Sequence, residues 1–383
     1  MKIGIITICK VNNYGAELQA FATQKKLEQM GFEAEIIDYI YYKNWRFKDT
    51  SKSAPFIALN LKGEIMYWIK YRFINRLVET VLPTISSSNR KRRKNYLDFF
   101  KLEKFSPSYY SMDELYANYP KYDVYVVGSD QVWNPSASSS IEPYFLTFAP
   151  KGSKKISYAS SFGVSEINPA LQNRYQELLN NIDFISVREK SGVDLVRQLT
   201  GKMAKQVVDP TLLLNKEQWS PYMSPIEGLA PKYILVYELL PSDDLVRLAK
   251  KIAGKLQIPI YCLCKRGYAI KHHQGTSNLV EAGPSEFIWL IAHATYVITN
   301  SFHGTAFSVN FGTPFYCVLN RKRKNNSRMT SLLVSLALEN RIVYEDEIEK
   351  KEIDYNSGHP IDNAQLAKLV ADSEEYLRTA LKI

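Results

Sequence analysis

The feature that most constrains this chain is a repeated pattern. A short apolar run ends in a polar or glycine-containing turn, and a helix-like segment follows. The first instance is a strand over residues 2–8, a helix that ends near Gly31, and a strand over residues 34–39. Strands that alternate with helices predict an α/β fold, with parallel sheets covered by helices on both faces. The helical face is marked by residues spaced four and three apart: Ala16, Ala20, Thr23, Leu27 and Met30.

The same pattern resumes after residue 105. Apolar runs at 124–127, 155–159, 184–187 and 207–208 each predict a strand, and each ends in a turn with polar side chains or glycine. In open α/β sheets, ligands bind outside the carboxyl ends of the strands. We therefore expect the functional site of this half of the chain in those turns.

Two domains are predicted for the 383 residues. Residues 215–231 contain three prolines and one glycine and are typical of a linker. A second set of strands follows at 233–239, 258–263, 296–299 and 315–319. We expect a first Rossmann-like domain over 1–214 and a second over 215–362. A C-terminal helix, 363–383, can pack back on the first domain.

Residues 41–105 interrupt the pattern and predict a helical, aromatic and basic insertion in the first domain. Ile65, Ile69, Phe73, Leu77 and Val81 recur every four residues, and Trp68, Ile74 and Val78 widen that stripe. Positive charge comes from Lys62, Lys70, Arg72 and Arg76. Such a helix can lie at a membrane interface. It can also pack on the domain, which is the arrangement we favour.

The chain carries a formal net charge of +10, part of it in the runs 90–94 and 321–324. This excess indicates either a solvated surface or an anionic partner: a substrate, a membrane surface or nucleic acid. No nucleic-acid-binding motif accompanies the charge, so nucleic acid is not expected. With no apolar run of membrane-spanning length and no signal-peptide pattern, a cytoplasmic protein is expected, with contact at the inner membrane face as an option.

The four cysteines are Cys9, Cys262, Cys264 and Cys317. Cys262 and Cys264 lack the two-residue gap and the second pair of a zinc site, so buried free thiols are expected. No metal ligand set and no cofactor are predicted.

The strongest local signal is residues 296–305, where a strand leads through Ser301-Phe302-His303-Gly304 into a helix. A helix N-terminus after a strand presents backbone N–H groups to an anion. Gly304 would let a ligand approach the backbone, and Gly304 and Thr305 would bind it. His303 can exchange a proton near neutral pH. The alternative is a histidine that only caps the helix.

Two further turns are candidates for binding a sugar. Asn13, Tyr14 and Gly15 follow the first strand, without the glycine pattern of a dinucleotide or triphosphate site. The alternative is a tight turn that feeds a helix. Asp130, Gln131 and Trp133 follow the strand at 124–127, and polar groups beside an aromatic ring suit a sugar.

Two arginines are candidates for binding an anion, because arginine binds carboxylate or phosphate through two parallel hydrogen bonds. Arg188 stands at a predicted strand end, and Arg328 follows the second basic run. The alternative for Arg188 is a surface pair with Glu189.

Taken together, these segments resemble the polysaccharide pyruvyl transferase family over most of the chain. The resemblance rests on six segments in a fixed order: 13–19, 128–134, 158–163, 186–189, 209–211 and 299–304. It implies two Rossmann-like domains facing a cleft, as in GT-B glycosyltransferases, with the acceptor on the first domain and the donor on the second. It also implies transfer of pyruvate from phosphoenolpyruvate to a sugar of a surface polysaccharide or its lipid-linked precursor, forming a ketal.

The residue roles follow from that resemblance. His303 and Arg188 match the histidine and an arginine around the donor. Some members carry arginine where this chain has Ser301, so Arg328 is a candidate for holding the donor carboxylate. His303 is assigned to proton transfer and Asp130 to orienting the acceptor. The chief alternative is a GT-B-type glycosyltransferase with a nucleotide-sugar donor, and a third is a binding protein for polysaccharide assembly.

Overall fold

The computed structural model describes residues 1–48, 61–135, 141–263, 274–322, 326–350, 352 and 363–382. The chain divides into two compact units. Unit 1 comprises Met1–Ser86, Phe100–Leu213 and Leu369–Ile383, and unit 2 comprises Ser87–Phe99 and Leu214–Lys368. The residues of the expected insertion are thus divided between the units at residue 87. The C-terminal helix begins in unit 2, and its residues from 369 onward belong to unit 1.

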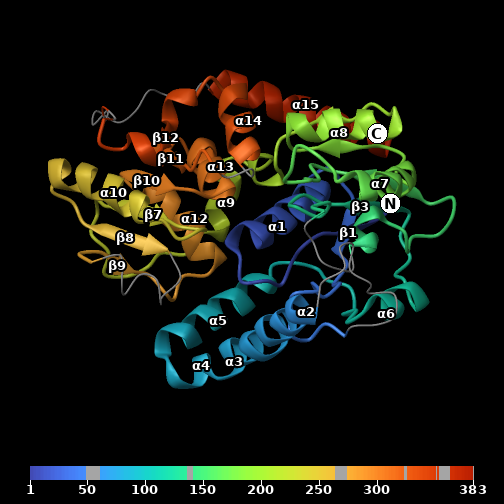
Figure 1. The fold of residues 1–383 in the computed structure, drawn as a ribbon, viewed down its shortest axis with the longest axis horizontal. Helices are drawn as coiled ribbons and strands as arrows, with labels where there is room; N and C mark the ends of the chain where they lie inside the picture. The colour runs from blue at the N-terminus through green and yellow to red at the C-terminus, as the bar shows by residue number, and fades with distance from the viewer. Residues whose placement is uncertain are drawn as a thin grey trace. The chain divides into compact units, whose positions relative to one another are not determined.

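Unit 1 is built on a parallel sheet with strand order β2-β1-β3-β4, and Figure 1 labels the two central strands, β1 and β3. Isolated bridges from Ile156 to Phe184 and from Ser160 to Val187 continue it to the short parallel pair β5-β6. The strands are β1 (Lys2–Ile6), β2 (Glu33–Ile36), β3 (Val124–Val127), β4 (Lys154–Ser157), β5 (Ser186–Val187) and β6 (Lys205–Gln206). This is the flavodoxin-like order, in which the chain reverses its progress across the sheet between β1 and β3.

The helices of unit 1 connect these strands. They are α1 (Tyr14–Gln29), α2 (Leu61–Trp68), the π-helix η1 (Ile69–Ile74), α3 (Asn75–Thr80), α4 (Leu82–Ile85), α6 (Met112–Ala117), η2 (Glu142–Phe145), α7 (Pro169–Asn180), α8 (Lys190–Thr200) and η3 (Pro210–Leu212). Capping residues and prolines set where these helices begin. Helix α7 starts at a proline, and the Asn168 side chain accepts the amide of Ala170 at 3.0 Å.

Unit 2 contains a six-stranded sheet in the order β12-β11-β10-β7-β8-β9, with every pair parallel. When the strands are numbered one to six along the chain and the sheet is read from β9 to β12, the order is 3-2-1-4-5-6, that of the Rossmann fold. The chain reverses its progress across the sheet between β7 and β10. The strands are β7 (Ile234–Tyr237), β8 (Ile260–Leu263), β9 (Ser277–Asn278), β10 (Tyr296–Thr299), β11 (Phe315–Leu319) and β12 (Ile342–Tyr344).

The helices of unit 2 include α10, which packs on β7, β8 and β10, and α13, which packs on β10 and β11. Among the described residues, the helices of this unit are α5 (Ser87–Phe100), α9 (Lys216–Trp219), η4 (Ser220–Tyr222), α10 (Asp243–Leu256), α12 (Pro284–His293), α13 (Phe302–Phe311), α14 (Ser327–Ser335), η6 (Glu339–Arg341), η7 (Glu345–Glu347) and α15 (Asn363–Leu381). Helix α15 ends in unit 1, where Ser373 Oγ accepts the N–H of Val208 at 3.0 Å.

The predicted α/β fold is confirmed, and so is most of the element order. The strands β3, β10 and β11 have the predicted bounds, and the helix α15 begins at the predicted residue and ends two residues earlier than predicted. The expected linker at 215–231 is wrong in part. It contains α9, whose Trp219 is fully buried and packs edge-on against Phe307, with ring centroids 5.3 Å apart. The prolines that suggested a linker include Pro221, which lies at the start of η4.

Helices α2, η1 and α3 follow one another without a break in unit 1. Hydrogen bonds fix them to residues 42–45. The Tyr67 hydroxyl donates to Tyr42 O at 2.8 Å, and Arg72 donates to the carbonyls of Tyr42 and Asn44 at 3.0 and 2.8 Å. The favoured prediction of a packed insertion is therefore confirmed, but the packed face is not the apolar stripe. In the part of the chain that the structure describes, no helix is long and apolar enough to cross a membrane.

Candidate functional site

The carboxyl ends of β1 and β3 meet where the sheet of unit 1 reverses. In this fold class that point is where ligands bind. A hydrogen bond joins the two ends, because Thr7 Oγ1 donates to Ser129 O at 2.9 Å. Asn13, Tyr14 and Gly15 follow β1, and Asp130 and Gln131 follow β3. The structure therefore brings two of the predicted segments to one edge of one sheet.

This edge of unit 1 has an unusual backbone. Three residues that follow neighbouring strands have left-handed conformations without being glycine: Lys10 (φ 52°), Asp130 (φ 70°) and Ala159 (φ 53°). A residue with a Cβ is less stable in this region by roughly 1–2 kcal/mol. Such outliers gather at functional sites, where the surrounding structure holds them in place. Their position makes the carboxyl edge of β1, β3 and β4 the candidate functional edge of this unit.

Asp130 is the candidate carboxylate on this edge. Its carbonyl accepts the N–H of Ser161 at 3.0 Å, which ties the end of β3 to the turn after β4. The side chain is half-buried, and its charge is among those that raise the pKa of Arg188. A partly exposed carboxylate at a strained strand end is suited to accept a hydrogen bond from a substrate hydroxyl.

Gln131 and Trp133 have different surroundings, although both were predicted to bind the acceptor. Gln131 lies against Gly163, where a Cβ would come within 2.2 Å of its Oε1, and Asn134 Nδ2 donates to that oxygen at 2.7 Å. Trp133 is fully buried and stacks on Phe145, with ring centroids 5.3 Å apart. Its indole N–H donates to Tyr144 O at 2.8 Å. This ring belongs to the hydrophobic core, and its prediction as an acceptor-binding residue has no support in this position.

Asn13 caps helix α1. Its Oδ1 accepts the N–H of Gly15 at 3.0 Å and of Ala16 at 3.4 Å, which is the tight turn feeding a helix that the sequence left open. Tyr14 and Gly15 are buried in the first turn. Asn13 itself is half-buried at the edge, so among these three residues it is the best placed to meet a ligand.

Glu17 holds the loop between β1 and α1 from the inside. Its carboxyl oxygens accept the N–H groups of Val11 and Lys10 at 2.5 and 2.9 Å. Burial raises the pKa of Glu17 to about 8, against the lowering effect of those two hydrogen bonds. The sequence analysis did not single out Glu17, because a glutamate in a helix gives no sign of being buried. Its role is to fix the loop that carries Asn13.

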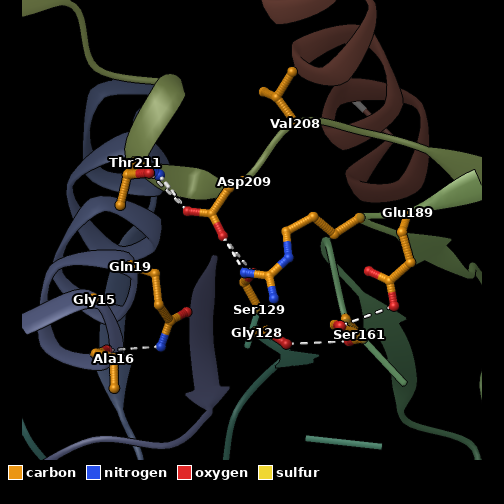
Figure 2. A network of polar contacts seen from close by, with 12 residues as sticks. Gly15, Ala16, Gln19, Gly128, Ser129, Ser161, Glu189, Val208, Asp209 and Thr211 are labelled. Atoms are coloured by element: carbon orange, nitrogen blue, oxygen red, sulfur yellow. Dashed lines mark hydrogen bonds and ion pairs between the residues drawn. The ribbon is translucent and has the colours of Figure 1, made fainter. Parts of the chain in front are cut away.

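Arg188 lies at the end of β5 in a buried ion pair. Its Nη1 is 2.6 Å from Asp209 Oδ2, and the two side chains are 2% and 0% exposed. Ser129 Oγ donates to the same carboxylate oxygen at 2.9 Å. Figure 2 shows Asp209 with Thr211 on its other side, where the Thr211 N–H and hydroxyl donate to Oδ1 at 3.0 and 2.8 Å. Burial lowers the pKa of Arg188, but the charges of Asp209, Glu189 and Asp130 outweigh it and raise the pKa.

Glu189 does not pair with Arg188 at the surface, so that alternative is wrong. Its Oε1 accepts the Ser161 hydroxyl at 2.8 Å and the N–H groups of Phe162 and Gly163 at 3.0 and 3.2 Å, and Figure 2 shows the contact with Ser161. The carboxylate thus fixes the turn after β4. Neither Asp209 nor Glu189 was predicted to have these partners, since the pairings join residues 21 and 28 positions apart in the chain.

The second group of predicted residues stands where the sheet of unit 2 reverses. Ser301 follows β10, which lies beside β7, and caps α13. Its Oγ accepts the N–H of Gly304 at 3.4 Å, and its carbonyl accepts the N–H and hydroxyl of Thr305, both at 3.0 Å. These bonds occupy the two N–H groups that the sequence assigned to an anion, so Gly304 and Thr305 do not present them to a donor.

Gly304 serves close packing. A Cβ at this residue would lie 2.5 Å from Thr299 Oγ1 and 2.9 Å from the Tyr237 ring. The glycine lets α13 approach the strands of its own sheet, and the expected role in ligand approach is replaced by this one. His303 is the second residue of α13, is 6% exposed, and lies edge-on to the Phe302 ring at 5.2 Å. Beside it, Asn300 ties the β7 end through bonds to Leu239 N and Leu240 O at 3.0 and 2.7 Å.

Arg328 is also buried, in the first turn of α14 in unit 2. The predicted residues therefore form two groups. Asn13, Asp130, Gln131 and Arg188 belong to the sheet edge of unit 1, and Ser301, His303 and Arg328 belong to unit 2. Among the described residues, no set of three His, Cys, Asp or Glu side chains has the arrangement of a metal site. His272, His273, His359 and Cys264 lie outside the described residues.

Two α/β units, each with a parallel sheet and candidate residues at its reversal point, define a GT-B-like fold. The family model for polysaccharide pyruvyl transferase matches residues 13–322, which span both units. The chain belongs to the polysaccharide pyruvyl transferase family.

Solved structures agree with the fold. A putative UDP-N-acetylglucosamine 2-epimerase from Listeria monocytogenes aligns with a TM-score of 0.51 at 10% identity, covering 99% of this chain and 97% of that chain. UDP-GlcNAc 2-epimerase from Methanocaldococcus jannaschii aligns at 0.49 and 11% identity, covering 98% and 100%. E. coli heptosyltransferase WaaC with ADP aligns at 0.40 and 11%, also covering 98% and 100%. At such low identities the similarity concerns the fold alone, and only the TM-score of 0.51 supports it. No curated protein matches the chain.

Proposed function

We propose that this enzyme transfers pyruvate from phosphoenolpyruvate to a sugar of a surface polysaccharide or its precursor, and that the product is a cyclic ketal. The observation that carries the proposal is the family match over residues 13–322. It is supported by the location of the candidate residues at the reversal points of two parallel sheets, where this fold class binds its ligands.

The chemistry requires one proton donor and one proton acceptor. An acceptor hydroxyl loses its proton to a base as its oxygen forms a bond to C2 of phosphoenolpyruvate, and the methylene carbon takes up a proton from an acid to become a methyl group. The bond between C2 and the phosphate oxygen then breaks, and phosphate leaves. A second acceptor hydroxyl closes the ketal at C2, and its proton leaves with phosphate or a base.

We assign the proton transfer to His303, an imidazole at the reversal point of unit 2. Asp130 orients the acceptor, with Asn13 and Gln131 beside it. Ser301 and Arg328 are the donor-side candidates in unit 2. For Arg188 we propose an indirect role, in which its pairing with Asp209 fixes the ends of β3 and β5.

The test is release of phosphate from phosphoenolpyruvate in the presence of extracted lipid-linked glycans. We expect His303→Ala to lower turnover by about 10²–10⁴-fold, the usual contribution of a positioned acid or base. His293→Ala is the matched control, because His293 is exposed at the end of α12 in the same unit. Full turnover by His303→Ala would refute the assignment. Release of a nucleoside diphosphate from a nucleotide sugar, with no use of phosphoenolpyruvate, would refute the donor.

We also propose that the enzyme works in the cytoplasm, where phosphoenolpyruvate is available, with peripheral contact at the inner face of the membrane. A lipid-linked acceptor would be presented at that face. No cofactor is invoked beyond the donor substrate.

A further inference from the structure

The continuous helix formed by α2, η1 and α3 has two opposite faces. One face packs on the unit and is half-buried: Gly63, Tyr67, Tyr71, Asn75 and Glu79. These residues are spaced by four, and they bond to residues 42–45. Asn75 donates to Lys43 O at 3.1 Å, and Trp45 donates to Glu79 at 2.8 Å. The fold is therefore held by the tyrosine-rich, polar face.

The opposite face is apolar and exposed. A shift of two residues along a helix is a rotation of about 200°, so a second four-residue series offset by two lies on the far side. That series and its neighbours, with the residues of α4, form the apolar face. Its members are Leu61, Ile65, Met66, Trp68, Ile69, Phe73, Ile74, Leu77, Val78, Val81 and Ile85, each 39–74% exposed.

The π-helix η1 helps to keep the central four-residue series of this face on one side of the helix. Residues spaced by four advance about 40° around an α-helix with 3.6 residues per turn, so a long series would spiral away from one side. The six residues of η1 wind more slowly, because their hydrogen bonds close over five residues in place of four. The slower turn offsets part of the drift and keeps Ile65, Phe73 and Leu77 on one side.

Positive charge accompanies the apolar face. Between residues 61 and 85, the exposed charged side chains are Lys62, Lys70 and Arg76, against the single exposed carboxylate of Glu64. Five consecutive basic residues, 90–94, follow Ile85 by five positions in the sequence. A large apolar surface with a basic surround marks a binding surface rather than ordinary exposure.

We infer that the apolar face of residues 61–85 docks on an anionic lipid bilayer. The twenty residues from Leu61 to Thr80 make a helix about 30 Å long, which would lie in the plane of the interface. Helices of this kind bury the apolar face about 5–10 Å into the boundary between headgroups and acyl chains, and basic side chains contact anionic headgroups. Trp68 suits this depth, because tryptophan favours the membrane–water interface.

The test is flotation of the full-length protein with phosphatidylcholine vesicles, with and without phosphatidylglycerol. We expect binding only to the anionic vesicles. It should weaken as salt shortens the screening length from about 10 Å at 0.1 M to about 3 Å at 1 M. The paired substitution Ile69→Ser with Phe73→Ser should lower binding about tenfold or more, since affinity follows buried apolar area.

The matched control is Met203→Ser with Val334→Ser, two exposed apolar side chains outside the apolar face that are 76% and 57% exposed. This variant should bind as the wild type does. Lys62→Glu with Lys70→Glu should weaken binding and flatten its salt dependence. Quenching of tryptophan fluorescence by brominated lipid should fall strongly in Trp68→Phe, because Trp68 is the most exposed of the five tryptophans. Trp133 and Trp219 are buried, and Trp45 and Trp289 are half-buried.

Three outcomes would overturn the inference. The protein could fail to float with anionic vesicles at low salt, or the Ile69 and Phe73 variant could bind unchanged. A dimer in solution that this variant dissociates, with no vesicle binding, would assign the face to a second copy of the chain. Because these measurements need no turnover, their result is independent of the proposed donor.

Discussion

The reversal points of the two sheets are built in contrasting ways. In unit 1, the edge carries charged side chains. Arg188 and Asp209 form a buried ion pair, and Asp130, which follows β3, has a left-handed backbone conformation. In unit 2, the edge is stabilised by hydrogen bonds to backbone groups and by close packing. Ser301 caps α13, and Gly304 lets that helix pack closely on its sheet. The contrast teaches that charged and glycine residues at strand ends can serve the fold. His303 and Asp130 remain the residues that we propose for the chemistry.

The largest effect should come from breaking the buried ion pair. Arg188→Ala leaves the carboxylate of Asp209 buried without its cation, and removal of one partner of such a pair destabilises by about 3–5 kcal/mol. Replacing both, with Arg188→Met and Asp209→Asn, should recover part of that loss, because the asparagine oxygen can still accept the N–H and hydroxyl of Thr211. Urea unfolding of the three proteins measures it.

The control for this comparison is Arg174→Ala, which removes an exposed pair with Glu177. Exposed pairs contribute about 0–1 kcal/mol, so its midpoint should barely move. If Arg188→Ala were as stable as Arg174→Ala while losing affinity for phosphoenolpyruvate, Arg188 would bind the donor directly, and the structural role proposed for it would be wrong.

Glu17 should make the stability of unit 1 depend on pH. Its pKa is about 8 in the fold and 4.5 as a free side chain, so the folded state binds the proton more tightly. The contribution of this pKa shift to the free energy of unfolding is complete below pH 4.5. It declines by about 1.4 kcal/mol for each pH unit as the pH rises towards 8. The difference in unfolding free energy between wild type and Glu17→Gln should shrink over that window. A constant difference would contradict the burial of Glu17.

Gly304→Ala probes the packed edge of unit 2. Its Cβ would meet Thr299 and Tyr237, and overpacking of this kind destabilises by about 1–3 kcal/mol. Gly254→Ala, in α10 of the same unit, meets nothing within 4 Å and should stabilise by about 0.5–1 kcal/mol. Thermal melting compares the two. Gly304→Ala that melts like the wild type but binds donor poorly would restore the ligand-approach role of this glycine.

The smallest effect on stability is expected for Asp130→Asn. Asparagine tolerates the left-handed conformation, so unfolding should change by only about 0.5 kcal/mol or less. Loss of the carboxylate should raise the KM for the glycan acceptor and leave the KM for phosphoenolpyruvate unchanged. Equal effects on both would place Asp130 outside acceptor binding.

The sequence predicted the fold well because its signals are local. Strands such as β3 and β10 are fully buried in parallel sheets, so they are continuous apolar runs with clear ends. The short strand β6 was displaced by two residues, because only one of its residues is partly buried. The packed face of residues 61–80 was also missed, because its tyrosines differ little in hydrophobicity from the residues of the apolar face.

The site was predicted less well because its determinants are distant pairings. The sequence indicates the strand ends, and these are where Asp130 and His303 lie. It does not indicate that Asp209 neutralises Arg188, that Glu189 binds the turn at Ser161, or that Trp133 is in the core. Each of these depends on which strands are neighbours in the sheet.

The most direct test of the central claim uses isotopically labelled phosphoenolpyruvate, the full-length enzyme and extracted lipid-linked glycans. Mass spectrometry follows the products. We predict a labelled product heavier by one pyruvyl ketal and phosphate released in equal amount, with both formed about 10²–10⁴-fold more slowly by His303→Ala. A glycan that stays unchanged with phosphoenolpyruvate but gains a sugar from a nucleotide-sugar donor would contradict the account.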